Sequence, residues 1–136
     1  MSQESPCPFC ALPVSRILAR NDFAITLRDT HPVTPGHTLV IPVRHVRSFF
    51  EATHAEREAM LALLDLAKQQ LQAEFNPAGY NIGINDGAAA GQTIAHLHMH
   101  LIPRYVGDRA DPRGGVRWVM PEKAAYWTQQ TPPGPT

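Results

Sequence analysis

The sequence predicts an α+β domain with an antiparallel sheet of about five strands and one main helix. Three observations predict this fold. Short β-type runs stand before and after one long helical segment, with no repeating alternation of strand and helix. A capping box opens the helical segment, and the last predicted strand carries a histidine at every second position. At 136 residues the chain has the length of a single domain.

Five segments are rich in aliphatic and β-branched residues. The first two, 17–20 and 23–27, flank Asn21 and Asp22, a pair typical of a hairpin turn. The other predicted strands are 37–41, which follows a Pro-Gly turn, 80–85 and 96–102.

The main helix is predicted at about 53–75. Thr53 and Glu56 have the spacing of a capping box, in which each side chain accepts a hydrogen bond from the other residue's amide. Asn76 and Pro77 then end the helix. Its apolar face recurs every three or four residues, at Met60, Leu64, Ala67, Leu71 and Phe75.

The ends of the chain are predicted to be flexible. Residues 1–6 are polar, and 128–136 have too few apolar groups to offset the entropy of ordering them. The chain 1–136 is therefore predicted to be one domain with its core at about 7–127. Residues 107–127 include a short C-terminal segment whose aromatic side chains can pack on one another.

Composition excludes some partners. Twelve basic residues balance twelve acidic residues, so the chain has no overall positive field for nucleic acid or an anionic membrane. It has no apolar run of membrane-spanning length and no secretory signal. The cytoplasm is the expected location.

Histidines alternate with apolar residues in the segment from His96 to His100. In a strand, His96, His98 and His100 would share one face, while Leu97 and Met99 would face the core. Backbones of the outer two histidines would lie about 13 Å apart, which makes one shared metal ion awkward. A neighbouring pair could still chelate a metal.

A loop of small residues precedes this segment. Asn85, Gly91, Gln92 and Thr93 belong to it, and its small side chains allow a phosphate to approach the backbone. Gln92 and Thr93 can donate hydrogen bonds to phosphate oxygens. The loop and the histidines together favour a phosphate site.

Two cysteines form the motif Cys7-Pro-Phe-Cys10. In the cytoplasm a lasting disulfide is not expected, so the pair indicates half of a metal site or a redox pair. No thioredoxin-like βαβ pattern surrounds the motif, which weakens the redox interpretation.

The sequence resembles the histidine triad (HIT) family of nucleotide hydrolases and transferases. The motif HLHMHLIPR at 96–104, the GQT at 91–93 and the block at 31–45 carry the resemblance, which extends over about 7–104. The resemblance implies the family's α+β fold and a homodimer with a continuous sheet.

The resemblance also implies roles for individual residues. His98 would attack the α-phosphorus and form a nucleotidyl-histidine intermediate, which water resolves. His100 would contact the phosphate, His37 would support the site, and Gln92 would contact an α-phosphate or leaving-group oxygen. Asp29 would bind ribose.

Some HIT proteins bind structural zinc through positions that correspond here to Cys7, Cys10, His45 and His96. Two thiolates and two imidazoles would close a tetrahedral site and leave no position for substrate. The resemblance therefore implies a structural Zn²⁺ that fixes the N-terminal segment to the sheet.

These observations predict a hydrolase that cleaves dinucleoside polyphosphates or nucleoside phosphoramidates to a nucleoside monophosphate. The third histidine, His100, favours hydrolysis over the family's sugar-nucleotide transferases, which usually carry glutamine at that position. The alternatives are a nucleotidyltransferase, a hydrolase that uses zinc-activated water, and a zinc-containing nucleotide-binding protein without turnover.

Overall fold

The computed structural model describes residues 7–128. The chain divides into two compact units, Met1–Tyr105 and Val106–Thr136. Residues 1–6 and 129–136, where flexible ends are predicted, lie outside the described residues, whereas Thr128 ends a short 3-10 helix. The prediction of one domain over 1–136 stays a prediction.

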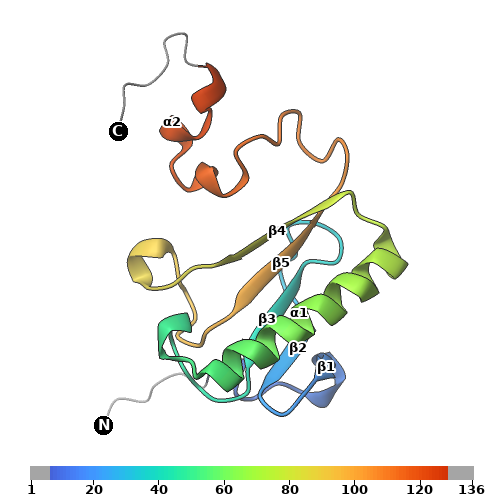
Figure 1. Ribbon diagram of the computed structural model, residues 1–136, viewed down its shortest axis with the longest axis vertical. Coiled ribbons are helices and arrows are strands. Elements are labelled where there is room, and N and C mark those ends of the chain that lie inside the picture. Colours follow the sequence, from blue (N-terminus) through green and yellow to red (C-terminus); the bar gives the residue numbers. More distant parts are fainter. Residues whose placement is uncertain (1–6, 129–136) are drawn as a thin grey trace. The chain divides into compact units, whose positions relative to one another are not determined.

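The first unit contains a five-stranded antiparallel sheet, as the sequence predicts (Figure 1). The strands lie in the order β1-β2-β3-β5-β4, so β1 and β4 form the edges. Their bounds are β1 Ile17–Arg20, β2 Ala24–Arg28, β3 Thr38–Pro42, β4 Gly79–Ile84 and β5 Met99–Arg104. Asn21 makes the first turn by accepting hydrogen bonds from the amides of Phe23 and Ala24.

The main helix, α1, spans His54–Phe75 and begins with the predicted capping box. Thr53 Oγ1 accepts from the Glu56 amide at 3.1 Å, and Glu56 Oε1 accepts from the Thr53 amide at 2.9 Å. Asn76 ends the helix in the left-handed conformation, with φ of 48°. The guanidinium of Arg44 binds the buried Glu56 carboxylate and, with the Thr53 amide, lowers the Glu56 pKa to about 2.

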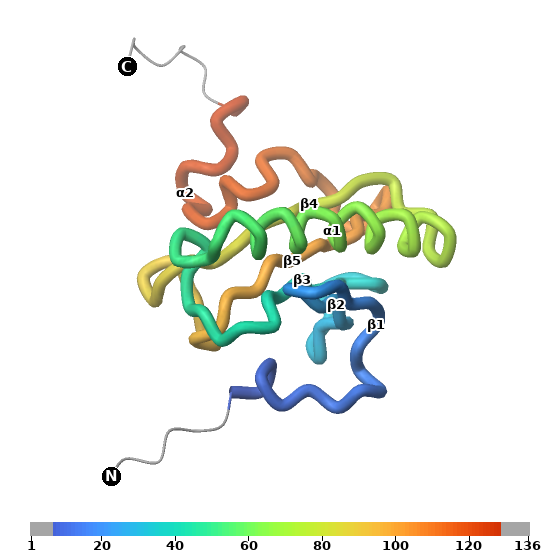
Figure 2. The backbone as a smooth tube through the Cα atoms, turned by 60° about the horizontal axis from the view of Figure 1, so that its bottom comes forward, coloured from blue at the N-terminus to red at the C-terminus, as the bar shows by residue number. Residues whose placement is uncertain are grey.

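The sheet is covered on both faces. One face packs against Met60 and Leu63 of α1 in a cluster that includes Val40. The other face packs against Phe9 of the N-terminal segment. In Figure 2 the strands lie between that segment and α1. This second cluster contains Phe9, Ile25, Leu27, Leu39 and Ile41. Short 3-10 helices at Val14–Arg16, Phe49–Glu51 and Ala88–Ala90 lie in the connections.

The prediction for the histidine strand is wrong at its start, because β5 begins at Met99 rather than at residue 96. The residues before Met99 hydrogen-bond outside the β3–β5 ladder. The Leu97 amide donates to Val46 O at 2.7 Å, and the His96 ring lies 2.8 Å from Pro42 O.

The second unit contains a 3-10 helix at Gly115–Val119, the four-residue helix α2 at Pro121–Ala124 and a 3-10 helix at Tyr126–Thr128. The Arg113 guanidinium lies 4.5 Å from the Trp127 ring centroid, and Trp118 Nε1 donates to Arg113 O. Among the described residues, no helix is long and apolar enough to span a bilayer.

Candidate functional site

The triad histidines keep the predicted alternation although two of them precede β5. Leu97 and Met99 lie in the cluster that α1 covers. The rings of His96 and His98 instead contact Phe9, on the opposite face of the sheet. The buried apolar side chains therefore hold the segment in place while its imidazoles face the N-terminal segment.

His98 has a defined hydrogen-bonding state. Its Nδ1 lies 2.8 Å from the main-chain oxygen of His96, and only 7% of the residue is exposed. A carbonyl oxygen can only accept, so Nδ1 carries the hydrogen. The other ring nitrogen, Nε2, consequently holds a lone pair in the neutral ring, which is the state required of a nucleophile.

His37 and His100 form a hydrogen-bonded pair beside His98. The Val33 amide donates to His37 Nδ1 at 3.2 Å, so His37 carries its hydrogen on Nε2. That nitrogen lies 2.9 Å from His100 Nδ1 and donates to it. His100 Nε2 is then a donor. The ring centroids of His98 and His100 are 5.2 Å apart. The lone pair of His98 Nε2 and the N–H group of His100 Nε2 therefore belong to adjacent rings.

Burial favours the neutral form of this pair. It lowers the pKa of His37, against the opposing effect of the Asp29 carboxylate. It also lowers the pKa of His100, and the neighbouring His98 and His37 rings lower it further. Asp29 Oδ2 lies 3.5 Å from His37 Nε2, so the predicted ribose-binding residue stands at the edge of this histidine pair.

The side chain of Gln92 links the small-residue loop to its own main chain and to the main chain at Arg47. Gln92 Oε1 accepts from the Gly87 amide at 2.8 Å, and Gln92 Nε2 donates to Arg47 O and Ile94 O at 3.0 Å each. Gly87 and Gly91 have positive φ, of 97° and 94°, and no atom lies within 4 Å of where their Cβ atoms would be. Asn85, Gly91 and Thr93 are exposed.

Two residues of the site were not predicted. Asp86 Oδ2 accepts from Ser48 Oγ and the Phe49 amide, at 3.0 and 2.9 Å, and fixes the start of the loop. Phe9 lies under the histidine rings. The only signal for Phe9 in the sequence is an aromatic residue between two cysteines.

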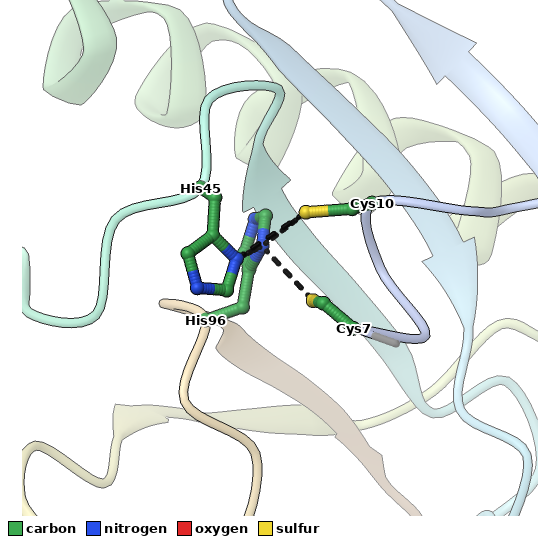
Figure 3. A group of neighbouring side chains, drawn as sticks. All are labelled: Cys7, Cys10, His45 and His96. Atoms are coloured by element: carbon green, nitrogen blue, oxygen red, sulfur yellow. Dashed lines mark hydrogen bonds between the residues drawn. The ribbon is translucent and has the colours of Figure 1, made fainter. Parts of the chain in front are cut away.

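A second group brings together the four predicted metal ligands (Figure 3). Cys7 Sγ lies 3.4 Å from His96 Nδ1, Cys10 Sγ lies 3.3 Å from His45 Nδ1, and the two Nδ1 atoms are 3.2 Å apart. Tetrahedral zinc, with bonds of about 2.05 Å to nitrogen and about 2.3 Å to sulfur, spaces two nitrogens by about 3.3 Å and a nitrogen and a sulfur by about 3.5 Å. The donor set and its spacing fit zinc.

His96 also has the second hydrogen bond expected of a metal-binding imidazole. Its Nε2 lies 2.8 Å from Pro42 O and donates to it, which leaves the Nδ1 lone pair facing the cysteines. His100 belongs to a different group, with Asp29 and His37. The outer histidines of the triad thus serve separate clusters, as the strand spacing predicts. His31 and His54 are exposed.

Comparison with known proteins identifies the family. The model of the HIT domain matches residues 14–107. The chain belongs to the HIT family. An uncharacterized HIT-like protein of Mycoplasma genitalium is 36% identical over 105 residues, which cover 74% of each chain.

Two HIT relatives carry names that state an activity. An asymmetrical bis(5'-nucleosyl)-tetraphosphatase of Schizosaccharomyces pombe is 36% identical over 74% of this chain and 56% of its own. An AP-4-A phosphorylase of Mycobacterium tuberculosis is 32% identical over 79% of this chain and 58% of its own. The chain thus matches little more than half the length of these two relatives.

Solved structures show the same HIT fold. A zinc-bound histidine triad protein of Mycobacterium smegmatis has a TM-score of 0.69 at 34% identity, over 78% of this chain and 80% of its own. The Plasmodium falciparum diadenosine triphosphate hydrolase, in complex with cyclomarin A, has a TM-score of 0.69 at 25% identity, over 71% and 66%.

Proposed function

We propose that this HIT protein is a nucleotide hydrolase in which His98 Nε2 attacks the α-phosphorus of a nucleotide. The observation that carries the proposal is the hydrogen bond from His98 Nδ1 to His96 O at 2.8 Å. It fixes the tautomer with the Nε2 lone pair and limits rotation of the ring. A neutral imidazole is a competent nucleophile because its unprotonated nitrogen offers a lone pair.

The reaction has two displacements. In the first, the Nε2 lone pair forms a P–N bond, and the bond from phosphorus to the leaving group breaks with its electron pair on the leaving atom. In the second, a water oxygen forms a bond to phosphorus, the P–N bond breaks, and the electron pair returns to Nε2. One proton of that water passes to solvent and the other stays on the product phosphate or also passes to solvent, so His98 is regenerated as the neutral ring.

The neighbouring groups would stabilise charge on the phosphate. His100 Nε2–H is aligned by the bond that His37 donates to the other His100 nitrogen, and it would donate to a non-bridging oxygen. Thr93 and the amides near Gly91 would bind the same phosphate. Gln92 would act chiefly by holding the loop, since its amide group already bonds three main-chain groups.

The remaining predicted contacts concern the nucleoside and the leaving group. Asp29 Oδ1 accepts from the His31 amide, and the carboxylate is available to ribose hydroxyls through its other lone pairs. Asn85 would lie beside the phosphates. The names of the two relatives support dinucleoside polyphosphates as the substrate class. Nucleoside phosphoramidates require the same attack at the α-phosphorus and belong to the same proposal.

Zinc would be structural in this protein. Cys7, Cys10, His45 and His96 would hold it as a closed four-ligand site, which fixes the N-terminal segment to the sheet. Thiolates stay reduced in the cytoplasm, which suits such a site. A homodimer through β4, an edge strand in which Ile82 is 49% exposed, would continue the sheet into a second copy.

A product assay tests the proposed function. Diadenosine tetraphosphate, an adenosine phosphoramidate and a single-stranded oligonucleotide are each incubated with the protein in water enriched in ¹⁸O. The expected product of the first two is AMP with one ¹⁸O, and the oligonucleotide is neither cleaved nor inhibitory at physiological salt.

Parallel reactions contain inorganic phosphate or a hexose 1-phosphate. Transfer of the nucleotide to phosphate in preference to water would indicate a phosphorylase, and transfer to the sugar phosphate would indicate a transferase. Nucleotide binding without any product would indicate a binding protein. Each of these three results would contradict hydrolysis.

A further inference from the structure

We propose that the segment 45–49 joins the metal cluster to the small-residue loop, and that Ser48 and Asp86 are positioning residues for the phosphate in that loop. The proposal rests on the proposed function, because it takes the loop as the site of the α-phosphate. It makes the alignment of the phosphate-binding amides depend on two polar side chains outside the triad and on the metal site.

The first two residues of segment 45–49 bond to the metal cluster and to the triad. His45 Nδ1 lies 3.3 Å from Cys10 Sγ and 3.2 Å from His96 Nδ1, as Figure 3 shows. Val46 O accepts a hydrogen bond from the Leu97 amide at 2.7 Å. One end of the segment therefore belongs to the group of four predicted metal ligands.

The next three residues hold the small-residue loop near both of its ends. Ser48 Oγ and the Phe49 amide donate to Asp86 Oδ2 at 3.0 and 2.9 Å, where the loop begins. Arg47 O accepts from Gln92 Nε2 at 3.0 Å, close to where the loop ends. Three hydrogen bonds to adjacent residues thus fix how far apart the two ends of the loop lie.

Hydrogen bonds within the loop join these two ends directly. The Gln92 amide donates to Gly87 O at 3.1 Å, and the Gly87 amide donates to Gln92 Oε1 at 2.8 Å. Residues 88–91 are exposed, so their amides depend on these anchors for alignment. A displacement of segment 45–49 would therefore move the amides that bind phosphate in the proposed function.

The far end of segment 45–49 is held by α1. Arg57 Nε donates to Phe49 O at 3.1 Å, and the Arg57 guanidinium lies 4.5 Å from the Phe49 ring centroid. The helix thus fixes one end of the segment, and the metal ligands would fix the other through His45. Loss of the metal would free the His45 end, and the motion would reach the loop through Arg47 and Ser48.

Replacement of Asp86 should weaken the binding of phosphate in particular. Asp86→Ala removes the acceptor of two hydrogen bonds and should release the start of the loop. We expect the affinity for AMP to fall by about 10-fold, the effect of about one hydrogen bond to a charged group. The affinity for adenosine, which has no phosphate, should not change. Asp86→Asn keeps an oxygen that can accept from both donors, so it should retain most of the AMP affinity.

The test compares the full-length zinc-loaded protein with Asp86→Ala, Asp86→Asn and Ser48→Ala. Asp65→Ala is the matched control, because Asp65 is an exposed carboxylate of α1. Three quantities are measured: the dissociation constants for AMP and adenosine by calorimetry, the single-turnover rate of adduct formation, and the exchange rates of the Phe49 and 87–92 amides by NMR. Exchange of the α1 amides reports unfolding of the whole unit.

Asp86→Ala should speed exchange of the Phe49 and 87–92 amides beyond any change in α1, and should slow adduct formation by about 10-fold. Ser48→Ala should have the same effects to a smaller extent, because the Phe49 amide still donates to Asp86. Asp65→Ala should have neither effect. Removing zinc from the wild-type protein with a chelator should speed exchange at 87–92 more than in α1, and removing it from Asp86→Ala should add less.

Unchanged AMP affinity in folded Asp86→Ala would overturn the positioning role, and so would an equal loss of AMP and adenosine affinity, which would indicate a general loss of structure. If Asp86→Ala does not fold, the same two outcomes in Ser48→Ala decide the question. Unchanged exchange at 87–92 in the chelated wild-type protein would disprove the link to the metal cluster. If the wild-type protein binds AMP but forms no adduct, the proposed function fails, and the affinity and exchange measurements still decide the roles of Ser48 and Asp86.

Discussion

The main-chain oxygen of His96 and the Nδ1 nitrogen of His98 lie 2.8 Å apart, within one short segment before β5. His96 therefore makes two separate contacts, one through its ring and one through its main chain. Its ring faces the cysteines, and its carbonyl holds the adjacent triad histidine. The metal cluster and the proposed nucleophile share this one residue.

Replacement of His98 should remove turnover while sparing binding. In His98→Ala, kcat should fall by about 10³-fold or more, because no atom remains to form the covalent intermediate. The affinity for AMP, measured by calorimetry, should change little. His54→Ala, at an exposed position at the start of α1, is the control and should keep wild-type kcat. Near-native kcat in His98→Ala would exclude covalent catalysis at this residue.

Gln92→Ala should act through the loop. The change removes one hydrogen bond to the Gly87 amide and two to main-chain oxygens, so the amides of 87–95 should exchange faster with solvent. We expect kcat to fall by about 10-fold as the amides proposed to bind phosphate lose their alignment. Gln69→Ala, on the exposed side of α1, controls for the loss of an amide side chain. A lower kcat with unchanged loop exchange would show that Gln92 acts directly on the substrate.

Zinc content and stability should change together. The purified protein should contain about one zinc per chain by elemental analysis, and Cys7→Ser with Cys10→Ser should contain almost none. Zinc at about 100 times its dissociation constant stabilises a folded protein by about 2.7 kcal/mol, which the double variant should lose in denaturant unfolding. His31→Ala, an exposed histidine outside the cluster, should retain the metal. Wild-type stability in the double variant would contradict a structural metal.

The buried histidine pair should make stability depend on pH. Burial lowers the pKa of His37 and His100 in the folded protein, and the carboxylate of Asp29 raises both pKa values by a smaller amount. Below about pH 6.5 the unfolded chain then binds more protons than the folded chain, so the free energy of unfolding falls as the pH falls. Each such proton contributes a slope of at most about 1.4 kcal/mol per pH unit.

Denaturant titrations between pH 7 and pH 5 test this dependence. Because other groups also titrate, the comparison is between the wild type and His37→Gln at the same zinc concentration. The variant should have the shallower slope. An equal slope in both proteins would mean that His37 is not held neutral.

The predictable parts of the fold depend on local interactions. The turn at Asn21 and the capping box of Thr53 and Glu56 are made by residues at most three positions apart, so the sequence alone was sufficient to place them. The five strands and α1 were found where the sequence predicts them. The limits of β1 agree with the prediction. The observed limits of the other strands differ from the predicted ones, and the difference is largest for β5.

The remaining features depend on distant partners. The start of β5 is set by Val46 O and Pro42 O, which take the bonds of Leu97 and His96. Cys7 and His96 meet across 89 residues, a contact that spacing could not supply and that only family resemblance indicated. The contact between Phe9 and His98 has the same origin in tertiary packing, and for that reason was not predicted.

The most direct test of the account is isolation of the nucleotidyl adduct on His98. Diadenosine tetraphosphate is mixed with excess protein and quenched within milliseconds in alkaline denaturant, because P–N bonds of this kind are labile in acid. Intact and peptide mass spectrometry should find one AMP group on the peptide that contains His98 and none in His98→Ala. Turnover of the substrate at times when no adduct forms, or an adduct that persists in His98→Ala, would contradict nucleophilic catalysis by His98.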